Sequence, residues 1–266
     1  MDLGTILGIA LSLAIVVMVM ILDGGNPLEL VSLPAPILLT LVGSMMATMA
    51  TTSLSNMLKL PKYFIIAIKE PHYKTEEAIE TLAKMADKAR REGLLALEEE
   101  SKKIKDPFLQ KGIMLVVDGV DPAQVRSILH TQIEHMQKRH EVGIHIFNTA
   151  GGFAPTFGII GTVMGLISVL KELDNPAKLA GSIASAFLAT LWGLLSSNMI
   201  FLPLGGKLQH KDTEEVAFKT MLLEGILSLQ AGENPRIVRE KLQAFLPPSA
   251  IAKAAAGTGK KEKAKA

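Results

Sequence analysis

Small and hydroxyl-bearing residues recur at helical spacing in two apolar stretches of this 266-residue chain. At steps of three to four residues, the two faces carry Pro155, Gly158, Thr162 and Gly165, and then Ala186, Thr190, Gly193 and Ser197. Small residues let helices approach closely, and serine and threonine hydroxyls can bridge between helices. Pro155 also frees a carbonyl oxygen on the preceding turn, because proline has no N–H. The pattern indicates either close helix packing alone or a pore wall whose threonine oxygens help to replace an ion's water shell.

The other chemistry-bearing residues do not form an enzyme-like arrangement. The chain has no cysteine, no phosphate loop, no zinc-protease motif, no nucleophile elbow and no paired carboxylates in a plausible pocket. His130, His135 and His140 lie five residues apart, which is poor spacing for one metal, and His145 lies further along the same segment. We interpret each histidine as solvated or interfacial, and expect no enzymatic activity, no cofactor and no metal site.

The distribution of charge indicates a membrane protein. No lysine or arginine precedes Lys59, and of the 28 basic residues 15 lie between Lys59 and Arg139 and 11 between Lys207 and Lys265. Four charge-free apolar stretches lie outside these groups: about Leu3–Leu22, Ser32–Leu54, Ile146–Leu170 and Leu179–Gly206. Each has the roughly 20 residues that a helix needs to cross a bilayer. None has polar residues at helical spacing along one face, as a helix of a large soluble protein would have.

The same charges predict the topology. Four spans place both termini and the long 55–145 loop on one side, and the positive-inside rule makes that side the cytoplasm. The first stretch lacks the basic region of a signal peptide, so we expect it to be retained as a helix. A net charge of +2 does not favour a nucleic-acid partner.

The four expected spans contain no aspartate, glutamate, lysine, arginine or histidine. Ionisable residues inside membranes usually mark ion and proton pathways. If this protein conducts ions, the titrating carboxylate must therefore come from a partner.

Outside the spans the pattern is helical throughout. Capping and periodicity predict cytoplasmic helices over Glu76–Arg91, Leu94–Ile104, Phe108–Val117 and Pro235–Phe245. Asp121-Pro122 starts a further helix that meets no breaker before the third span, and the fourth span is expected to continue through Lys207 to Gln230. An interfacial segment is expected over Lys59–Tyr73.

A compact group of opposite charges surrounds Gly93. Arg90 and Arg91 precede it, and Glu98, Glu99 and Glu100 follow it. A charge run is usually a solvated face. The alternative is a docking surface for a partner with the complementary pattern, because charges set orientation and association rate.

Six blocks of the sequence resemble the MotA/PomA family of flagellar stator subunits. In order they are MDLGTILGIA (residues 1–10), ARREGLLALEEE (89–100), FLQKGIMLVVDG (108–119), APTFGIIGTVMGLI (154–167), ATLWGLLSSNMIFLP (189–203) and EGILSLQAGENPR (224–236). The resemblance covers about residues 1–247, and the order of two spans, a large cytoplasmic insert and two spans is similar as well.

The resemblance implies an all-α inner-membrane protein that forms a homopentamer around a dimer of a single-span MotB/PomB-type partner. That partner would carry the titrating aspartate, and ion flow would drive torque on the rotor protein FliG. Carried over by motif, the rotor-contacting charges are Arg90 and Glu98, with Arg91 and Glu99 as auxiliaries. The prolines that couple ion passage to movement are Pro155 and Pro203.

The transported ion is either H⁺ or Na⁺. In the sodium-driven branch of the family a threonine stands seven residues after the first proline, and Thr162 occupies that position here. This branch also often has two adjacent threonines in the fourth span, whereas the present sequence has Ala189-Thr190. Together they favour sodium slightly.

The expected organisation follows from these blocks. Its parts are spans one and two (residues 1–55), a torque-generating helical domain (56–145), pore-lining spans three and four (146–206), C-terminal helices (207–247) and a disordered Lys/Ala-rich tail (248–266). Two alternatives stay open: a TolQ/ExbB-type energiser, which usually has three spans and lacks the Arg90/Glu98 pattern, and a non-conducting membrane scaffold.

Overall fold

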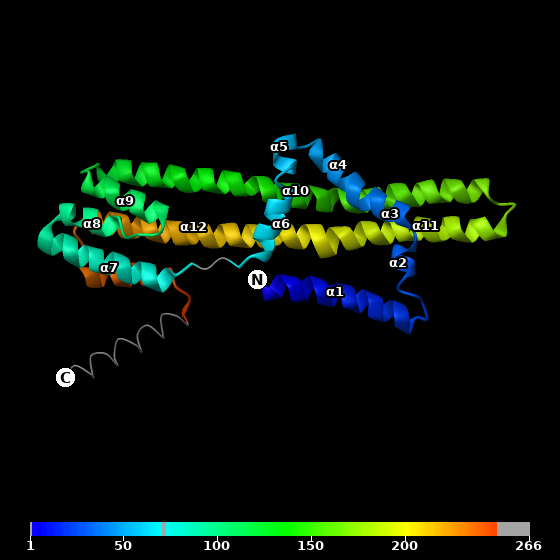
Figure 1. Ribbon diagram of the computed structural model, residues 1–266, viewed down its shortest axis with the longest axis horizontal. Coiled ribbons are helices and arrows are strands. Elements are labelled where there is room, and N and C mark those ends of the chain that lie inside the picture. The colour runs from blue at the N-terminus through cyan, green and yellow to red at the C-terminus, as the bar shows by residue number, and fades with distance from the viewer. Residues whose placement is uncertain (1, 71–72, 249–266) are drawn as a thin grey trace. The chain divides into compact units, whose positions relative to one another are not determined.

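The computed structural model describes residues 2–70 and 73–248, and all elements in these ranges are helices (Figure 1). The predicted disordered tail lies outside the described residues, apart from Pro248. The chain divides into two units, one formed by Met1–Pro71 and Arg139–Lys211, the other by His72–Lys138 and Asp212–Ala266.

The long helices pass from one unit into the other. As predicted, one unbroken helix, α10, runs from Pro122 to Lys171 with Pro155 inside it. The predicted continuity of the fourth span is confirmed too: α11 (Pro176–Leu195) is followed without a break by a π-helical turn, η3 (Ser196–Phe201), and then by α12 (Leu202–Gln230).

The first unit also contains the N-terminal helices. They are α1 (Leu3–Leu22), α2 (Glu29–Ser32), α3 (Pro34–Ile37), the π-helical turn η1 (Leu38–Val42), α4 (Gly43–Met49), α5 (Leu54–Met57) and α6 (Leu60–Ile68). In the described residues, three helices are long and apolar enough to cross a membrane: α1, α10 and the Lys178–Gln230 helix.

The expected second span is shorter than the sequence indicated. Its helical part covers only Pro34–Met49, whereas the apolar stretch runs from Ser32 to Leu54. Proline defines the start of this helix. At its other end, the hydroxyls of Thr48 and Thr51 bond to backbone carbonyls of the same segment, an alternative that competes with helix propagation.

The end of α6 is fixed to α1 and α12 by hydrogen bonds to its last carbonyls. The Lys211 ammonium donates at 2.6 Å to the carbonyls of Ile66, Ala67 and Lys69. The backbone N–H of Asp2 donates to Ile68 at 2.8 Å, and the Asp2 carboxylate pairs with Lys207. The hydrogen bond from Lys207, reinforced by backbone donation from α1, lowers the pKa of Asp2 to about 2. Helix ends expose unsatisfied carbonyls, so this cluster anchors the segment.

The second unit is built from α7 (Thr75–Glu92), the 3₁₀ turn η2 (Leu94–Leu97), α8 (Glu98–Ser101), α9 (Pro107–Val117) and α13 (Pro235–Gln243), together with the ends of α10 and α12. Its core is aliphatic, and the largest fully buried side chains include Leu82, Leu97, Ile113, Leu129, Met221, Leu222, Ile226, Leu229 and Leu242. The helix expected over Leu94–Ile104 is shorter than predicted, because Gly93, at a φ of 84°, starts a 3₁₀ turn and α8 ends at Ser101.

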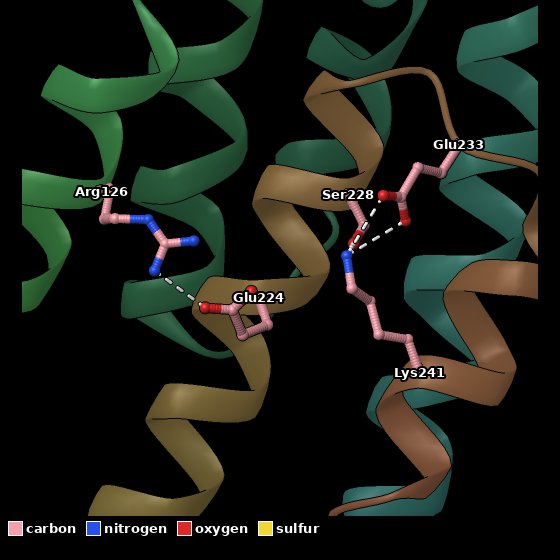
Figure 2. Close-up of polar contacts among 5 residues, drawn as sticks. All are labelled: Arg126, Glu224, Ser228, Glu233 and Lys241. Atoms are coloured by element: carbon pink, nitrogen blue, oxygen red, sulfur yellow. Dashed lines mark hydrogen bonds and ion pairs between the residues drawn. The ribbon is translucent and has the colours of Figure 1, made fainter.

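Polar contacts fix the end of α12 on both sides (Figure 2). Arg126 of α10 pairs with Glu224 at 3.0 Å, and Lys241 of α13 reaches Ser228 and Glu233, each at 3.1 Å. These contacts lie within or beside the block Glu224–Arg236, and they hold α10, α12 and α13 together.

The ionisation of Tyr73 at alkaline pH is expected to report on the folding of the second unit. Its hydroxyl donates to Glu215 at 3.1 Å and its ring stacks on Phe218. Burial, followed by the Glu215 charge, raises the pKa of Tyr73. The neutral phenol is favoured in the folded state, so its stabilisation is complete below the unfolded pKa of about 10 and is lost as the pH rises above it.

Tyr63→Phe leaves Tyr73 as the only tyrosine, since the chain has two. In spectrophotometric titration of this variant, tyrosinate should not form at pH 10 and should appear only at higher pH. The control Tyr63→Phe/Glu215→Gln should ionise at a lower pH, and ionisation near pH 10 in both variants would contradict the assignment.

Candidate functional site

α10 and α11 run side by side (Figure 1). The two small-residue faces predicted from the sequence lie against each other at this contact. A methyl group added at Gly158 would lie 2.9 Å from the carbonyl oxygen of Ala189, and one added at Gly193 would lie 2.8 Å from that of Ala154. One added at Gly165 would lie 2.6 Å from the Ala186 methyl. Only glycine permits backbones to approach this closely.

The close approach brings oxygen atoms of both helices together. The Thr162 hydroxyl lies 3.1 Å from the carbonyl of Gly158 in its own helix and 3.1 Å from the carbonyl of Ala186 in α11. It is also in contact with the Thr190 hydroxyl. Both threonines are only partly buried. We call Thr162, Thr190 and the Ala186 carbonyl the oxygen cluster.

The two prolines lie at different irregularities of the helices. Pro155 is inside α10, beside the first residues of the contact with α11. Pro203 follows the π-helical turn η3, whose last cap bond runs from the N–H of Leu202 to the carbonyl of Ser197. The Ser197 hydroxyl crosses to α10 and donates to the carbonyl of Gly151 at 2.7 Å.

Four of the charged residues around Gly93 are exposed, near the junction of α7 and η2: Arg90, Arg91, Glu98 and Glu99. Arg90 and Arg91 lie in the last turn of α7, and Glu98 and Glu99 in the first turn of α8. In the described part of the chain no ion pair joins these arginines to these glutamates. Arg91 pairs with Asp87 at 2.8 Å. Both glutamates pair with Lys102, at 3.3 and 2.8 Å, and this lysine lowers the pKa of Glu99.

These four charges also suit the helices that carry them, since cations favour helix C-termini and anions favour N-termini. Their exposure leaves them accessible to a partner at the same time. The geometry is therefore compatible with both interpretations of the charge pattern.

Comparisons with known proteins decide the family. Residues 100–221 match the MotA/TolQ/ExbB proton channel family. Motility protein A of Borreliella burgdorferi is 42% identical over 80% of this chain and 82% of that protein. Chemotaxis protein PomA of Vibrio alginolyticus is 36% identical over 92% of this chain and 96% of that protein. The chain belongs to the MotA/PomA family.

Solved structures of this family have the same fold. The structure of C. jejuni MotAB superposes with a TM-score of 0.88 and 33% identity, covering 93% of this chain and 97% of that one. The structure of the flagellar MotAB stator complex from Bacillus subtilis also superposes with a TM-score of 0.88. It is 35% identical and covers 94% of this chain and 98% of that one. Membership in the MotA/PomA family confirms the predicted resemblance and places the chain among the ion-transporting stator components of the flagellar motor.

Sequence reasoning missed the buried anchor of α6 in this MotA/PomA-family chain. Lys207 and Lys211 lie four residues apart after the fourth span, so the sequence did indicate two cations on one helix face. Their partners, Asp2 and the carbonyls of α6, lie far away along the chain and gave no signal. The Ala186 carbonyl was missed for a similar reason, because backbone oxygens carry no sequence signature.

Proposed function

We propose that this protein is the ion-conducting stator subunit of a flagellar motor, and that it couples inward ion flow to torque on the rotor protein FliG. The observation that carries the proposal is the oxygen cluster, formed between the third and fourth apolar stretches (residues 146–170 and 179–206), which contain no aspartate, glutamate, lysine, arginine or histidine. An ion that passes this point finds oxygens able to replace part of its water, but no group able to hold a proton.

The missing carboxylate belongs to a partner. We assign it to a single-span MotB/PomB-type subunit, since the similar solved structures are MotAB complexes. A ring of copies of this chain, a pentamer by family resemblance, would surround that partner and contact membrane lipid. Moving one charge across 100 mV releases about 2.3 kcal/mol, enough to bias a packed ring between rotational states.

The proposed topology has four spans in the cytoplasmic (inner) membrane and both termini inside. Three spans are the long apolar helices, and the short Pro34–Met49 helix is the fourth. A helix shorter than the bilayer core is accommodated by local thinning of the bilayer at modest cost. The basic residues from Lys59 to Arg139 and after Lys207 then lie in the cytoplasm.

We propose sodium as the transported ion. Hydroxyl and carbonyl oxygens are ligands suited to a hard cation, and the oxygen cluster supplies both kinds. The cluster and the Gly158 carbonyl offer four oxygens with two lone pairs each, and the two hydroxyl protons and the two helical N–H groups of Thr162 and Thr190 occupy only part of them. Lone pairs therefore remain for a cation.

Replacing sodium by potassium at a constant proton gradient tests whether sodium is the transported ion. A stator-deleted host that carries this protein and its cognate partner should stop swimming without sodium and recover when sodium returns. Thr162→Ala should lower the apparent sodium affinity of swimming by roughly tenfold, about the effect of losing one strong polar contact. The matched control is Thr156→Ala, because the Thr156 hydroxyl bonds to its own helix at Phe153.

Each outcome of this test has a meaning. Swimming that is indifferent to sodium, and equal in Thr162→Ala and Thr156→Ala, would make the protein a proton-driven stator. No swimming in either medium, with both proteins in the membrane, would favour a TolQ/ExbB-type energiser if ions still flow. It would favour a non-conducting scaffold if they do not.

The rotor-facing role is assigned to Arg90 and Glu98, with Arg91 and Glu99 as auxiliaries. Arg90→Glu/Glu98→Lys reverses two exposed charges and should abolish most swimming while ion conductance stays unchanged. The complementary reversal in FliG should restore part of it. Lys84→Glu, also exposed on α7, is the control and should swim normally. Normal swimming of the double reversal would contradict the assignment.

A further inference from the structure

Pro155 leaves a backbone carbonyl of α10 without its usual donor. In an α-helix the N–H of residue 155 would donate to the carbonyl of Gly151, but proline has no N–H. A carbonyl left unsatisfied in an apolar surrounding is costly, so it needs another donor.

That donor is Ser197 of the neighbouring helix. Its hydroxyl donates to the Gly151 carbonyl at 2.7 Å, and the residue is only 2% exposed. The residues beside it behave differently: the Ser196 hydroxyl donates to Trp192 at 2.7 Å, and the Asn198 amide donates to Leu194 at 3.0 Å. Both of these bonds stay within the residue's own helix. Ser197 therefore repairs the gap that Pro155 creates in α10.

Ser197 also belongs to the irregular turn before the second proline. Its own carbonyl accepts the N–H of Leu202, five residues further on, as in a π-helix, and Pro203 follows directly. Leu202 packs at Gly151, where an added methyl group would lie 2.6 Å from its side chain. One serine thus joins the turn opened by Pro155 to the π-helical turn that ends at Phe201, two residues before Pro203.

We propose that Ser197 is a positioning residue that ties the two proline sites together, so that a change of bend at Pro155 in α10 displaces the start of α12. Because Pro155 supplies no N–H, the Ser197 hydroxyl takes the place of the missing donor at the Gly151 carbonyl. The hydrogen bond itself is independent of the proposed stator function, and only its consequence for torque rests on it.

Carbonyl chemical shifts test the hydrogen bond directly. Glycine labelled with ¹³C at the carbonyl and with ¹⁵N gives carbonyl–nitrogen correlations only where two glycines are adjacent, namely at Gly24-Gly25, Gly151-Gly152 and Gly205-Gly206. Solid-state spectra of the full-length protein with its partner in lipid therefore report on the Gly151 carbonyl with two internal references. Ser197→Ala should shift the Gly151 signal alone, and Ser196→Ala should leave all three in place.

The dependence on proline is tested in a double-mutant cycle. Pro155→Ala restores an N–H that can bond to Gly151, so adding Ser197→Ala to that variant should move the Gly151 signal little further. An equal shift with and without Pro155 would overturn the proposal, as would an unchanged signal in Ser197→Ala.

Stall torque, compared with ion conductance, tests whether Ser197 couples the bend at Pro155 to the start of α12. Ser197→Ala should lower stall torque roughly threefold to tenfold, the range expected for one hydrogen bond between membrane helices. Its ion conductance and its amount in the membrane should stay near those of Ser196→Ala. Ser197→Thr keeps a hydroxyl and should restore most of the torque. Loss of torque and conductance in equal proportion, without rescue by Ser197→Thr, would mean a purely structural role.

The two readouts separate this proposal from the stator function. A shifted Gly151 signal in a protein that never supports motility would leave the hydrogen bond intact and reject the stator function. A motile stator in which Ser197→Ala changes neither the Gly151 signal nor the torque would reject Ser197 alone.

Discussion

Gly193→Ala is expected to destabilise the contact between α10 and α11 by about 2–3 kcal/mol, the upper part of the range for overpacking. The added methyl group would lie 2.8 Å from the Ala154 carbonyl oxygen and 3.0 Å from the Gly158 Cα. Both are backbone atoms, so no side chain can turn away to make room. The helices must separate, which also moves Thr190 away from Thr162 and breaks the oxygen cluster.

The measurement is thermal unfolding of the solubilised protein followed by size-exclusion chromatography. For a chain of this size the midpoint should fall by roughly 4–12 °C, and motility should be lost. Gly181→Ala is the control in the same helix, because in the described part of the chain no atom outside the helix's own nearby backbone lies within 4 Å of its added methyl group. It should leave the midpoint unchanged or raise it slightly, since alanine is the better helix former. Equal midpoints for both variants would show that the helices are not in close contact.

Lys211→Met is expected to cost about 3 kcal/mol or more, because it removes the buried donor of three carbonyl groups. Lys211 is only 7% exposed, and methionine fills a similar volume without supplying a hydrogen bond. The carbonyls of Ile66, Ala67 and Lys69 would then lose the donor that they share, and the Ala67 bond is buried. The expected result is a loosened α6.

Limited proteolysis and thermal unfolding measure this effect. The segment after α6 should become sensitive to protease in Lys211→Met, and the unfolding midpoint should fall. Lys59→Met is the control, since among the bonds described the ammonium of this exposed lysine makes only one, a solvent-exposed bond to the Asn56 side chain at 3.3 Å. Exposed substitutions of this kind usually change stability by less than about 0.5 kcal/mol. Similar behaviour of the two variants would mean that the Lys211 bonds do not hold α6.

Local signals in the sequence determined the helical elements. Asp106-Pro107 and Asn234-Pro235 place a side-chain acceptor and a proline at a helix start, and α9 and α13 begin at those prolines. The absence of a breaker between Pro122 and Gly143 predicted the long α10. The sequence overestimated helix length after Met49, where a threonine hydroxyl bonds to a backbone carbonyl, and after Gly93, where a positive φ starts a 3₁₀ turn. Helix ends depend on small differences in free energy.

The sequence by itself determined the charge-free stretches, the missing carboxylate and the two small-residue faces, because composition and spacing are properties of the chain alone. The tertiary structure decided which groups meet: Thr162 with the Ala186 carbonyl, Ser197 with Gly151, and Lys211 with the end of α6. In each pair one member is a backbone carbonyl, which every residue carries. No residue pattern distinguishes such an oxygen until the fold has buried it and brought a donor within reach.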